Sequence, residues 1–397
     1  MTNPDTAIPT SAPISGWRDW TSVAVLSTLG TFLSMIFLAV APIQIALSVH
    51  FGGGEGADAL AQWVMGVPGI GMAGGGILAG FVIDRLGLRG TLIAGLGCYG
   101  LTGAAGLVVD EAWGLLGSRL LLGVAGVVFA TAAATLLSQR FEGPARARVL
   151  GFQNGIAAVG GLLVIYLSAA LAAAFGWRWS FALFLIAFVP LLLALVAIPR
   201  RSPAPRLEMT AEGLLPLAPL YGLITFIMAA TFIGSIQAPF ILKQDGLATE
   251  GTVGTLLAVS SIAFGVGGVA YGWIRPRLGA RFVMALGLVA MGGGAIIIGA
   301  LPGLGAADGG VLVLGIGGGV LVPNLINILI DGTSESVRDR AIGLFFTASF
   351  IGTPLNTIIM PLLTQATGLR GAVLLAGALL VAGAFYAVLR RPARAAS

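Results

Sequence analysis

The composition of this 397-residue chain excludes a water-soluble globular protein. Hydrophobic residues make up 57% of the chain and charged residues only 9%, whereas soluble proteins carry about 25% charged residues to cover their surface. The 61 glycines would destabilise soluble helices, but small residues let membrane helices pack closely. The net charge of +5 is interpreted as orienting membrane helices, so we expect no nucleic-acid partner.

Apolar segments of about 20 residues, the length that spans a bilayer, recur along the chain. The sequence predicts six spans in its first half, at 21–49, 61–83, 91–109, 113–138, 149–174 and 179–198. It predicts six more at 217–243, 252–274, 282–300, 310–330, 341–366 and 370–390. The polar, proline-rich stretch 199–216 is the predicted cytoplasmic linker between an N-terminal six-helix bundle (1–198) and a C-terminal one (217–397).

The distribution of Lys and Arg predicts how these helices are oriented. With the N-terminus in the cytoplasm, 17 of the 21 basic residues fall on the inner side. Arg178, Lys243 and Arg370 fall outside, and Arg119 lies within a span. Because cytoplasmic loops carry the excess of basic residues, we expect a multi-pass plasma (inner) membrane protein with both termini in the cytoplasm.

The two halves of the chain are related by an ungapped shift of 192 residues. This shift places the segment 80–89 on 272–281 and Arg178 on Arg370. Parallel repeats related by an axis along the membrane normal are a known transporter plan. The predicted fold class is therefore an all-α membrane protein with 12 transmembrane helices in two pseudo-symmetric six-helix bundles.

A spaced set of glycines and charges lies between the second and third spans, namely Gly80, Asp84, Arg85, Gly87 and Arg89. It resembles motif A of the major facilitator superfamily. Arg119 and Gly123 in the fourth span resemble motif B of the drug/metabolite:proton antiporters within that superfamily, as does the run 176–181 (GWRWSF). The resemblance covers nearly all of the chain and implies the major facilitator fold and transport by alternating access.

The chain departs from the superfamily's motifs at a few positions. Leu88 stands where motif A usually has a basic residue, the second copy has Pro276 in place of Asp84, and Ile156 replaces the proline of motif C. Gly87 permits the tight turn of motif A.

Two interpretations of the motif A charges stay open. Asp84 and the neighbouring arginines are expected to pair with charges such as Arg146 or Arg340 in one conformation only, which makes a conformational latch. Alternatively, Arg85 and Arg89 only anchor the inner side.

Arg119 is the predicted intramembrane charge, about 9 Å from the outer end of its helix. All 16 Asp and Glu residues fall in predicted loops, termini or helix ends, which weakens proton antiport through a buried carboxylate. Spans 1, 4, 7 and 10 line the cavity in the superfamily that the chain resembles. We therefore expect Arg119, Gln44 and Gln237 to form one polar layer that binds an anionic or strongly polar substrate group. In the alternatives, Arg119 pairs with Asp110 or Glu111, or only braces a helix.

Buried amides in the second half are further candidates for substrate binding. Asn324 and Asn327 lie on one face of the tenth span beside Pro323, and Asn356 lies in the eleventh. Hydrogen bonding between helices is the alternative role for all three. His50 is expected at the outer interface. No metal-ligand cluster, phosphate-binding loop or activated nucleophile is present, so we predict no enzyme, metal or cofactor.

The sequence predicts a secondary active transporter of a small organic solute. Proton-linked export of an organic compound or drug is favoured by the antiporter resemblance. Uptake or exchange of an organic anion through Arg119 is the alternative, and a non-transporting membrane sensor or enzyme is a remote one. The expected partners are a small-molecule substrate, protons and membrane lipid, and the protein is expected to be a monomer.

Overall fold

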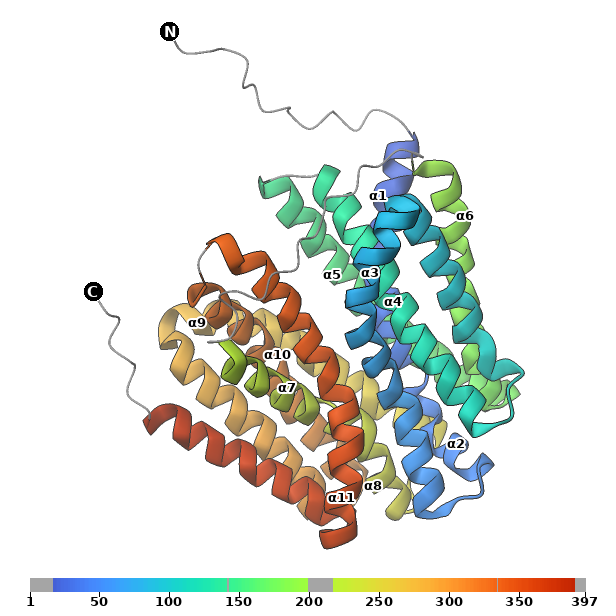
Figure 1. The fold of residues 1–397 in the computed structure, drawn as a ribbon. Helices are drawn as coiled ribbons and strands as arrows, with labels where there is room; N and C mark the ends of the chain where they lie inside the picture. The colour runs from blue at the N-terminus through green and yellow to red at the C-terminus, as the bar shows by residue number, and fades with distance from the viewer. Residues whose placement is uncertain (1–16, 141–142, 199–216, 334, 390–397) are drawn as a thin grey trace.

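The computed structural model of the chain describes residues 17–140, 143–198, 217–333 and 335–389. Within these ranges the chain is almost entirely helical and contains no β-strand. Figure 1 shows two groups of helices, one running from α1 to α6 and the other from α7 to α11. The predicted linker 199–216 lies outside the described residues, so the predicted domain boundaries stay a prediction.

Long helices and short 3₁₀ or π stretches, labelled η, make up both groups. The first contains α1 (Trp17–Leu38), η1 (Ala41–Ile43), α2 (Gln44–His50), α3 (Gly54–Ala104), η2 (Ala105–Leu107), α4 (Ala112–Arg140), α5 (Gly143–Phe175), η3 (Trp177–Ala187) and α6 (Phe188–Ala197). The second contains α7 (Ala218–Thr231), η5 (Ile233–Gln237), α8 (Ala238–Gln244), α9 (Glu250–Ala300), α10 (Leu304–Asp331) and α11 (Glu335–Leu389). Among the described residues, eight helical stretches are long and apolar enough to cross a membrane, and α5 adds the shorter apolar stretch Val159–Phe175.

The longest helices, α3, α9 and α11, each turn sharply at a glycine. Gly87, Gly279 and Gly368 have φ of 69°, 74° and 74°, a region that residues with a Cβ rarely adopt. Each of these helices therefore supplies two spans. Once they are divided at these glycines, helical segments lie over all of the predicted spans, and the predicted all-α fold class is confirmed.

The first and seventh spans lie where they were predicted, but each is broken along its length. The first span passes from α1 through Pro42 before it resumes as α2. The seventh passes from α7 through the π turn η5 into α8, which contains Pro239. Proline has no N–H to donate to the preceding turn, which favours a break. The breaks leave Gln44 at the start of α2 and Gln237 at the end of η5.

Arginines tie neighbouring helices together near one end of each half. Arg89 Nη2 of α3 donates to Leu195 O of α6 at 2.6 Å. Arg281 Nε of α9 donates to Ala387 O of α11 at 2.8 Å. Donors and acceptors are both related by the shift of 192 residues, so the sequence repeat is also a repeat of contacts.

A second pair of arginines repeats this arrangement at the other end. Arg178 Nη1 of η3 donates to Val109 O at 3.2 Å. Arg370 Nη1 of α11 donates to Leu301 O at 3.1 Å. These residues also obey the 192-residue shift. The second limb of α3 is thereby tied to α6 at one end and, through the residues that follow it, to η3 at the other, and the second limb of α9 is tied to the second limb of α11.

The two groups of helices meet mainly toward one end. We call the end at which α1 begins the inner end and the opposite one the outer end, after the predicted orientation. Contacts between the groups join α3 to α11, α5 to α9 and α2 to α8. In Figure 1, α2 and α8 lie together at the bottom, whereas α1 begins at the top.

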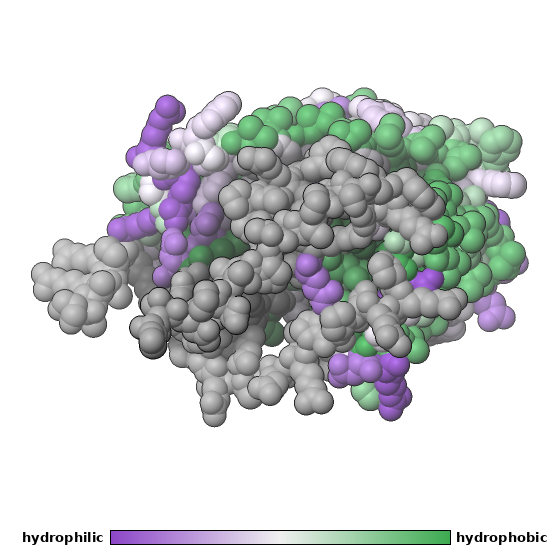
Figure 2. Space-filling view, turned by 90° about the horizontal axis from the view of Figure 1, so that it is seen from above, coloured by the Kyte–Doolittle hydropathy of each residue, from purple (hydrophilic) through white to green (hydrophobic). Residues whose placement is uncertain are grey.

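Hydrophobic side chains cover much of the perimeter of the described chain. In Figure 2, seen from the inner end, hydrophobic residues occupy the upper and right-hand edges, and hydrophilic ones gather at the left and bottom. Apolar side chains along the spans, such as Leu163, Val269 and Leu362, are more than half exposed. A large apolar perimeter is what lipid contact requires.

Candidate functional site

Buried polar side chains from both halves meet toward the outer end, and we call this group the amide seam: Gln44, Gln62, Gln237, Thr353 and Asn356. Gln44 Nε2 donates to Ser235 O of η5 at 2.7 Å. Gln237 Nε2 donates to Gln62 Oε1 of α3 at 3.1 Å and to Asn356 Oδ1 of α11 at 2.9 Å. Each residue of the amide seam is at most 7% exposed. The broken helices thus exchange amide hydrogen bonds across the boundary between the halves.

The predicted site residues Gln44, Gln237 and Asn356 are brought together in this seam. Gln62 of α3 was not among the predicted site residues. Its polarity within an apolar helix was the available signal.

Three oxygen atoms of the amide seam have no hydrogen-bond partner. They are Gln44 Oε1, Gln237 Oε1 and Thr353 Oγ1, and all three residues are 0% exposed. Buried polar atoms usually have a partner, since each unpaired one costs about 1 to 3 kcal/mol. The seam therefore has unused capacity to accept hydrogen bonds.

An ion pair closes the outer side of the seam. Lys243 Nζ of α8 donates to Asp58 Oδ1 of α3 at 2.5 Å and to Ser48 Oγ of α2 at 3.0 Å. Ser48 also donates to Asp58. The Lys243 and Asp58 side chains are 28% and 27% exposed, so the pair lies between solvent and the buried amides. We call Lys243 and Asp58 the outer ion pair, and Ser48 bonds to both of them.

Small residues let the halves approach closely on the inner side of the amides. A Cβ placed on Gly66 of α3 would overlap the Thr357 side chain of α11. A Cβ on Gly69 would lie 2.6 Å from both Phe350 O and Pro354 Cδ. Any side chain at these positions would force α3 and α11 apart.

Arg119 does not join the amide seam. Its Nη2 donates to Thr102 O and Gly103 O of α3, at 3.2 and 2.5 Å. Its guanidinium carbon lies 4.8 Å and 5.0 Å from the ring centroids of Phe181 and Phe184 in η3. The side chain is 0% exposed, and its contacts are with the first half alone.

These contacts bear on the expectations for Arg119. The structure does not bring it together with Gln44 and Gln237 into one layer. The alternative partner Asp110 pairs with Arg178 instead. Arg119 Nε and Nη1 have no partner, so the bracing contacts use only part of the guanidinium.

Asn324 and Asn327 are bonded within the second half. Asn324 Oδ1 accepts from Arg275 Nε of α9 at 3.1 Å, and its Nδ2 donates to Ala280 O at 3.0 Å. Asn327 Nδ2 donates to Tyr271 Oη at 2.7 Å. These bonds match the alternative in which the amides hold α9 against α10, and they lie away from the amide seam.

The motif A residues lie around the turn in α3. Gly80 is half-buried, and Asp84 is exposed without an ion pair to any described residue. The Arg85 guanidinium lies 3.9 Å from the Phe81 ring centroid. Gly87 makes the turn and Arg89 ties α3 to α6. The side chains of the expected partners Arg146 and Arg340 lie outside the described residues, so the latch stays a prediction.

Several acidic residues expected in loops lie inside helices, Asp58 and Asp308 among them, and that prediction was wrong for these residues. α3 begins at Gly54 and α10 at Leu304, several residues before the predicted spans, so they include Asp58 and Asp308. Neither position is in the middle of its helix. Asp308 Oδ1 is buried and has no partner. Local hydropathy misplaced both helix starts, because polar residues can occupy the outer turn of a membrane helix.

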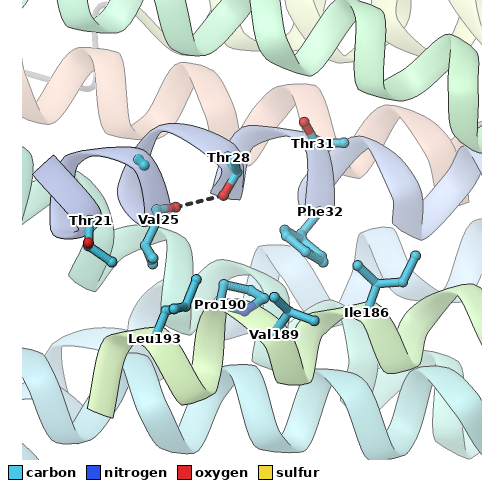
Figure 3. Close-up of a pocket in the computed structure, with 10 residues that line it drawn as sticks. Thr21, Val25, Thr28, Thr31, Phe32, Ile186, Val189, Pro190 and Leu193 are labelled. Atoms are coloured by element: carbon cyan, nitrogen blue, oxygen red, sulfur yellow. Dashed lines mark hydrogen bonds between the residues drawn. The ribbon is translucent and has the colours of Figure 1, made fainter. Parts of the chain in front are cut away.

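A separate groove of about 690 Å³ opens between α1 and the η3–α6 region (Figure 3). Its lining residues are Thr21, Ala24, Val25, Thr28, Thr31, Phe32, Ile186, Val189, Pro190 and Leu193. The Thr28 hydroxyl donates to Val25 O at 2.8 Å, and that of Thr31 to Ile156 O at 3.4 Å. The groove is mainly apolar and contains no predicted site residue.

His50 is exposed at the outer end, with its ring 5.0 Å from the ring centroids of Trp177 and Phe51. It contacts aromatic rings in an interfacial position. The described part of the chain contains no group of three or more His, Cys, Asp or Glu residues placed to hold a metal ion.

Comparison with known proteins identifies the family. A family model described as Major Facilitator Superfamily matches residues 22–226 and 219–397. The cephamycin export protein of Amycolatopsis lactamdurans is 29% identical over 161 residues, which cover 40% of this chain and 33% of that protein. The facilitated glucose transporter member 8 of solute carrier family 2 from Mus musculus is 32% identical over 154 residues, covering 38% and 31%. The aligned part thus spans about a third of each relative.

Solved structures share the fold over almost the whole chain. A point mutant of the nucleoside transporter NupG has a TM-score of 0.76 at 14% identity, covering 93% of this chain and 98% of that one. A D-xylose-proton symporter has 0.73 at 17% identity, covering 93% and 96%. A POT family transporter bound to 5-aminolevulinic acid has 0.77 at 10%, covering 92% and 95%. The chain is a multi-pass membrane protein, and it belongs to the major facilitator superfamily.

Proposed function

We propose that this chain exports a small organic compound across the plasma membrane by alternating access, as a monomer with both termini in the cytoplasm. Proton influx is the proposed source of energy. The resemblance to the drug/metabolite:proton antiporters and the similarity to a cephamycin export protein support export. The 17-to-3 excess of inner basic residues supports the orientation.

The observation that carries this proposal is the set of bonds across the outer half of the molecule. Gln44, Gln237 and Lys243 each donate to a group in the opposite half. Side chains that bond across two rigid halves stabilise one arrangement and must separate in the other. With the outer side joined, the site faces inward in this arrangement, ready to take up cytoplasmic solute.

Motif A supplies the opposing contacts in this proposal. Asp84 is exposed and unpaired among the described residues. When the inner ends approach each other, it pairs with a basic side chain of a neighbouring loop, and the outer bonds break. The two sets of contacts thus balance the two arrangements.

Transport in proteoliposomes tests the proposal. Purified protein is reconstituted, a pH gradient is imposed, and flux of neutral, cationic and anionic organic compounds is measured. We expect flux of at least one compound that reverses with the gradient and is lost in Asp84→Asn. Flux that ignores the gradient contradicts proton coupling, and the absence of flux across a broad panel contradicts the transport activity.

A second candidate is an organic-anion carrier, favoured by the two unpartnered nitrogens of Arg119. A buried guanidinium with free N–H groups attracts carboxylates. Flux of an anion that falls in Arg119→Gln, but survives in Arg119→Lys, supports this candidate. If both variants transport anions as the parent does, per folded molecule, Arg119 only braces α4 against α3 and η3.

A further inference from the structure

The hydrogen-bonding inventory of the amide seam is unbalanced. The amide nitrogens of Gln44 and Asn356 donate to backbone carbonyls. Gln44 Nε2 donates to Ala41 O and Ser235 O, and Asn356 Nδ2 donates to Ala229 O. Gln237 Nε2 bonds two side-chain oxygens. The fully buried atoms of the seam without any partner are oxygens, on Gln44, Gln237 and Thr353. Its most deeply buried part therefore has acceptor oxygens to spare.

The unpaired oxygens come from both halves of the transporter. Gln44 belongs to α2, whereas Gln237 and Thr353 belong to η5 and α11. Separating the halves at the outer end would free Ser235 O and Gln62 Oε1 as well, and one N–H on each of Gln44 and Gln237. The Thr353 hydroxyl can both accept and donate.

The charged residues around the seam also favour a ligand with hydroxyl or ammonium groups over one with a carboxylate. On the outer side of the seam, the Lys243 ammonium is held by Asp58 and Ser48. Arg119 bonds carbonyls inside the first half. A carboxylate entering the seam would meet the unpaired oxygens of Gln44 and Gln237, whereas a hydroxyl or ammonium group would find in them acceptors that are already desolvated.

We propose that the amide seam selects solutes by their hydrogen-bond donors, with the oxygens of Gln44, Gln237 and Thr353 as acceptors. The ligand class is a neutral or cationic organic compound that carries hydroxyl or ammonium groups, and carboxylates are rejected. This inference rests on the proposed transport function and names the substrate class of the same site.

Thr353→Val and Thr357→Val form a matched pair of variants. Both residues lie on α11 and are at most 1% exposed, and valine has the shape of threonine. Thr357 Oγ1 donates to Pro354 O of its own helix at 2.9 Å, whereas Thr353 Oγ1 has no partner. Removing the Thr353 hydroxyl breaks no bond in this arrangement, so the variant should fold.

The probe compounds test whether the hydrogen-bond donors of a ligand, rather than the rest of the ligand, determine binding. Binding of D-glucose and uridine to purified protein is compared with binding of their fully O-methylated derivatives, which keep the acceptor oxygens and lose the hydroxyl donors. Benzoate is the anionic probe, and tetraphenylphosphonium is a cation without donors. We expect D-glucose or uridine to bind, methylation to weaken binding, and Thr353→Val to raise the Kd about three- to tenfold, the effect of one hydrogen bond. Thr357→Val should leave the Kd unchanged.

Contrary outcomes are equally clear. Binding of benzoate or tetraphenylphosphonium alone, of no probe, or equal binding of methylated and parent compounds overturns the inference. Equal effects of the two valine variants on the Kd also overturn it, because they would reflect packing. Flux measured in parallel separates the two proposals: binding with this pattern but without flux contradicts transport, and flux without this pattern contradicts donor selection.

Discussion

Removing the Asp58 carboxylate should shift the transporter toward an arrangement that is open on the outer side. In Asp58→Asn, Lys243 keeps its Ser48 bond but loses its ion-pair partner across the two halves. Exposed ion pairs contribute up to about 1 kcal/mol, and charge-assisted hydrogen bonds about 1.5 to 3 kcal/mol. At about one quarter exposed, this pair should contribute about 1 to 2 kcal/mol, which changes the population ratio about five- to thirtyfold.

Cysteine labelling measures this shift. Thr357 is 1% exposed and lies against Gly66 across the seam, so Thr357→Cys should react only when the halves separate. The native Cys98 is replaced by alanine, and a membrane-impermeant maleimide is added from outside. We expect Asp58→Asn to raise the labelling rate about five- to thirtyfold, in line with the population shift.

Two comparisons make the result decisive. Asp110→Asn removes an exposed carboxylate that pairs with Arg178 inside one half, and it should leave labelling unchanged. Exchanging Asp58 and Lys243 should restore slow labelling. If Asp58→Asn labels like the parent protein, the outer ion pair does not stabilise this arrangement. Labelling from the inner side alone contradicts the proposed orientation.

Two further predictions concern stability. A Cβ on Gly123 of α4 would overlap Pro68 O of α3, so Gly123→Ala should cost about 3 kcal/mol, read as a lower melting temperature in detergent; unchanged melting refutes the close approach. The Gly303 N–H and the Arg370 guanidinium lower the pKa of Asp245, so its carboxylate stabilises the fold at neutral pH and this contribution is lost as the pH falls through that lowered pKa. Asp245→Asn should therefore lower the melting temperature at pH 7, and the difference should shrink below about pH 4; an equal difference at both pH values refutes this.

Much of the fold was predictable, because a bilayer limits both helix length and side-chain polarity. The helical segments lie where hydropathy placed the spans, and the 192-residue shift predicted repeat-related arginines such as Arg178 and Arg370. The breaks at Pro42 and η5 were not predicted, since proline also occurs within intact membrane helices such as α10. A break depends on which neighbouring groups satisfy the freed carbonyls, and those groups are distant in sequence.

The candidate site was predictable only in part. Gln44 and Gln237 were expected at similar depth, and the broken helices bring them to one seam. Arg119 was expected beside them because it lies in the fourth span, and the fourth span lines the cavity in the superfamily that the chain resembles. The Arg119 side chain instead leaves α4 toward Phe181 and Phe184. Composition does not indicate which face of a uniformly apolar helix is turned toward the cavity. Asp58 was missed because it was assigned to a loop.

The four arginine ties have a consequence for how such a molecule can move. Arg89 and Arg178 hold the second limb of α3 against η3 and α6 near both membrane surfaces, and Arg281 and Arg370 do the same in the other half. Segments fastened at both ends cannot splay independently, so each tied pair behaves as a stiff lever. A pair of spectroscopic labels within one lever should report a single fixed separation, whereas a pair spanning the seam should report two.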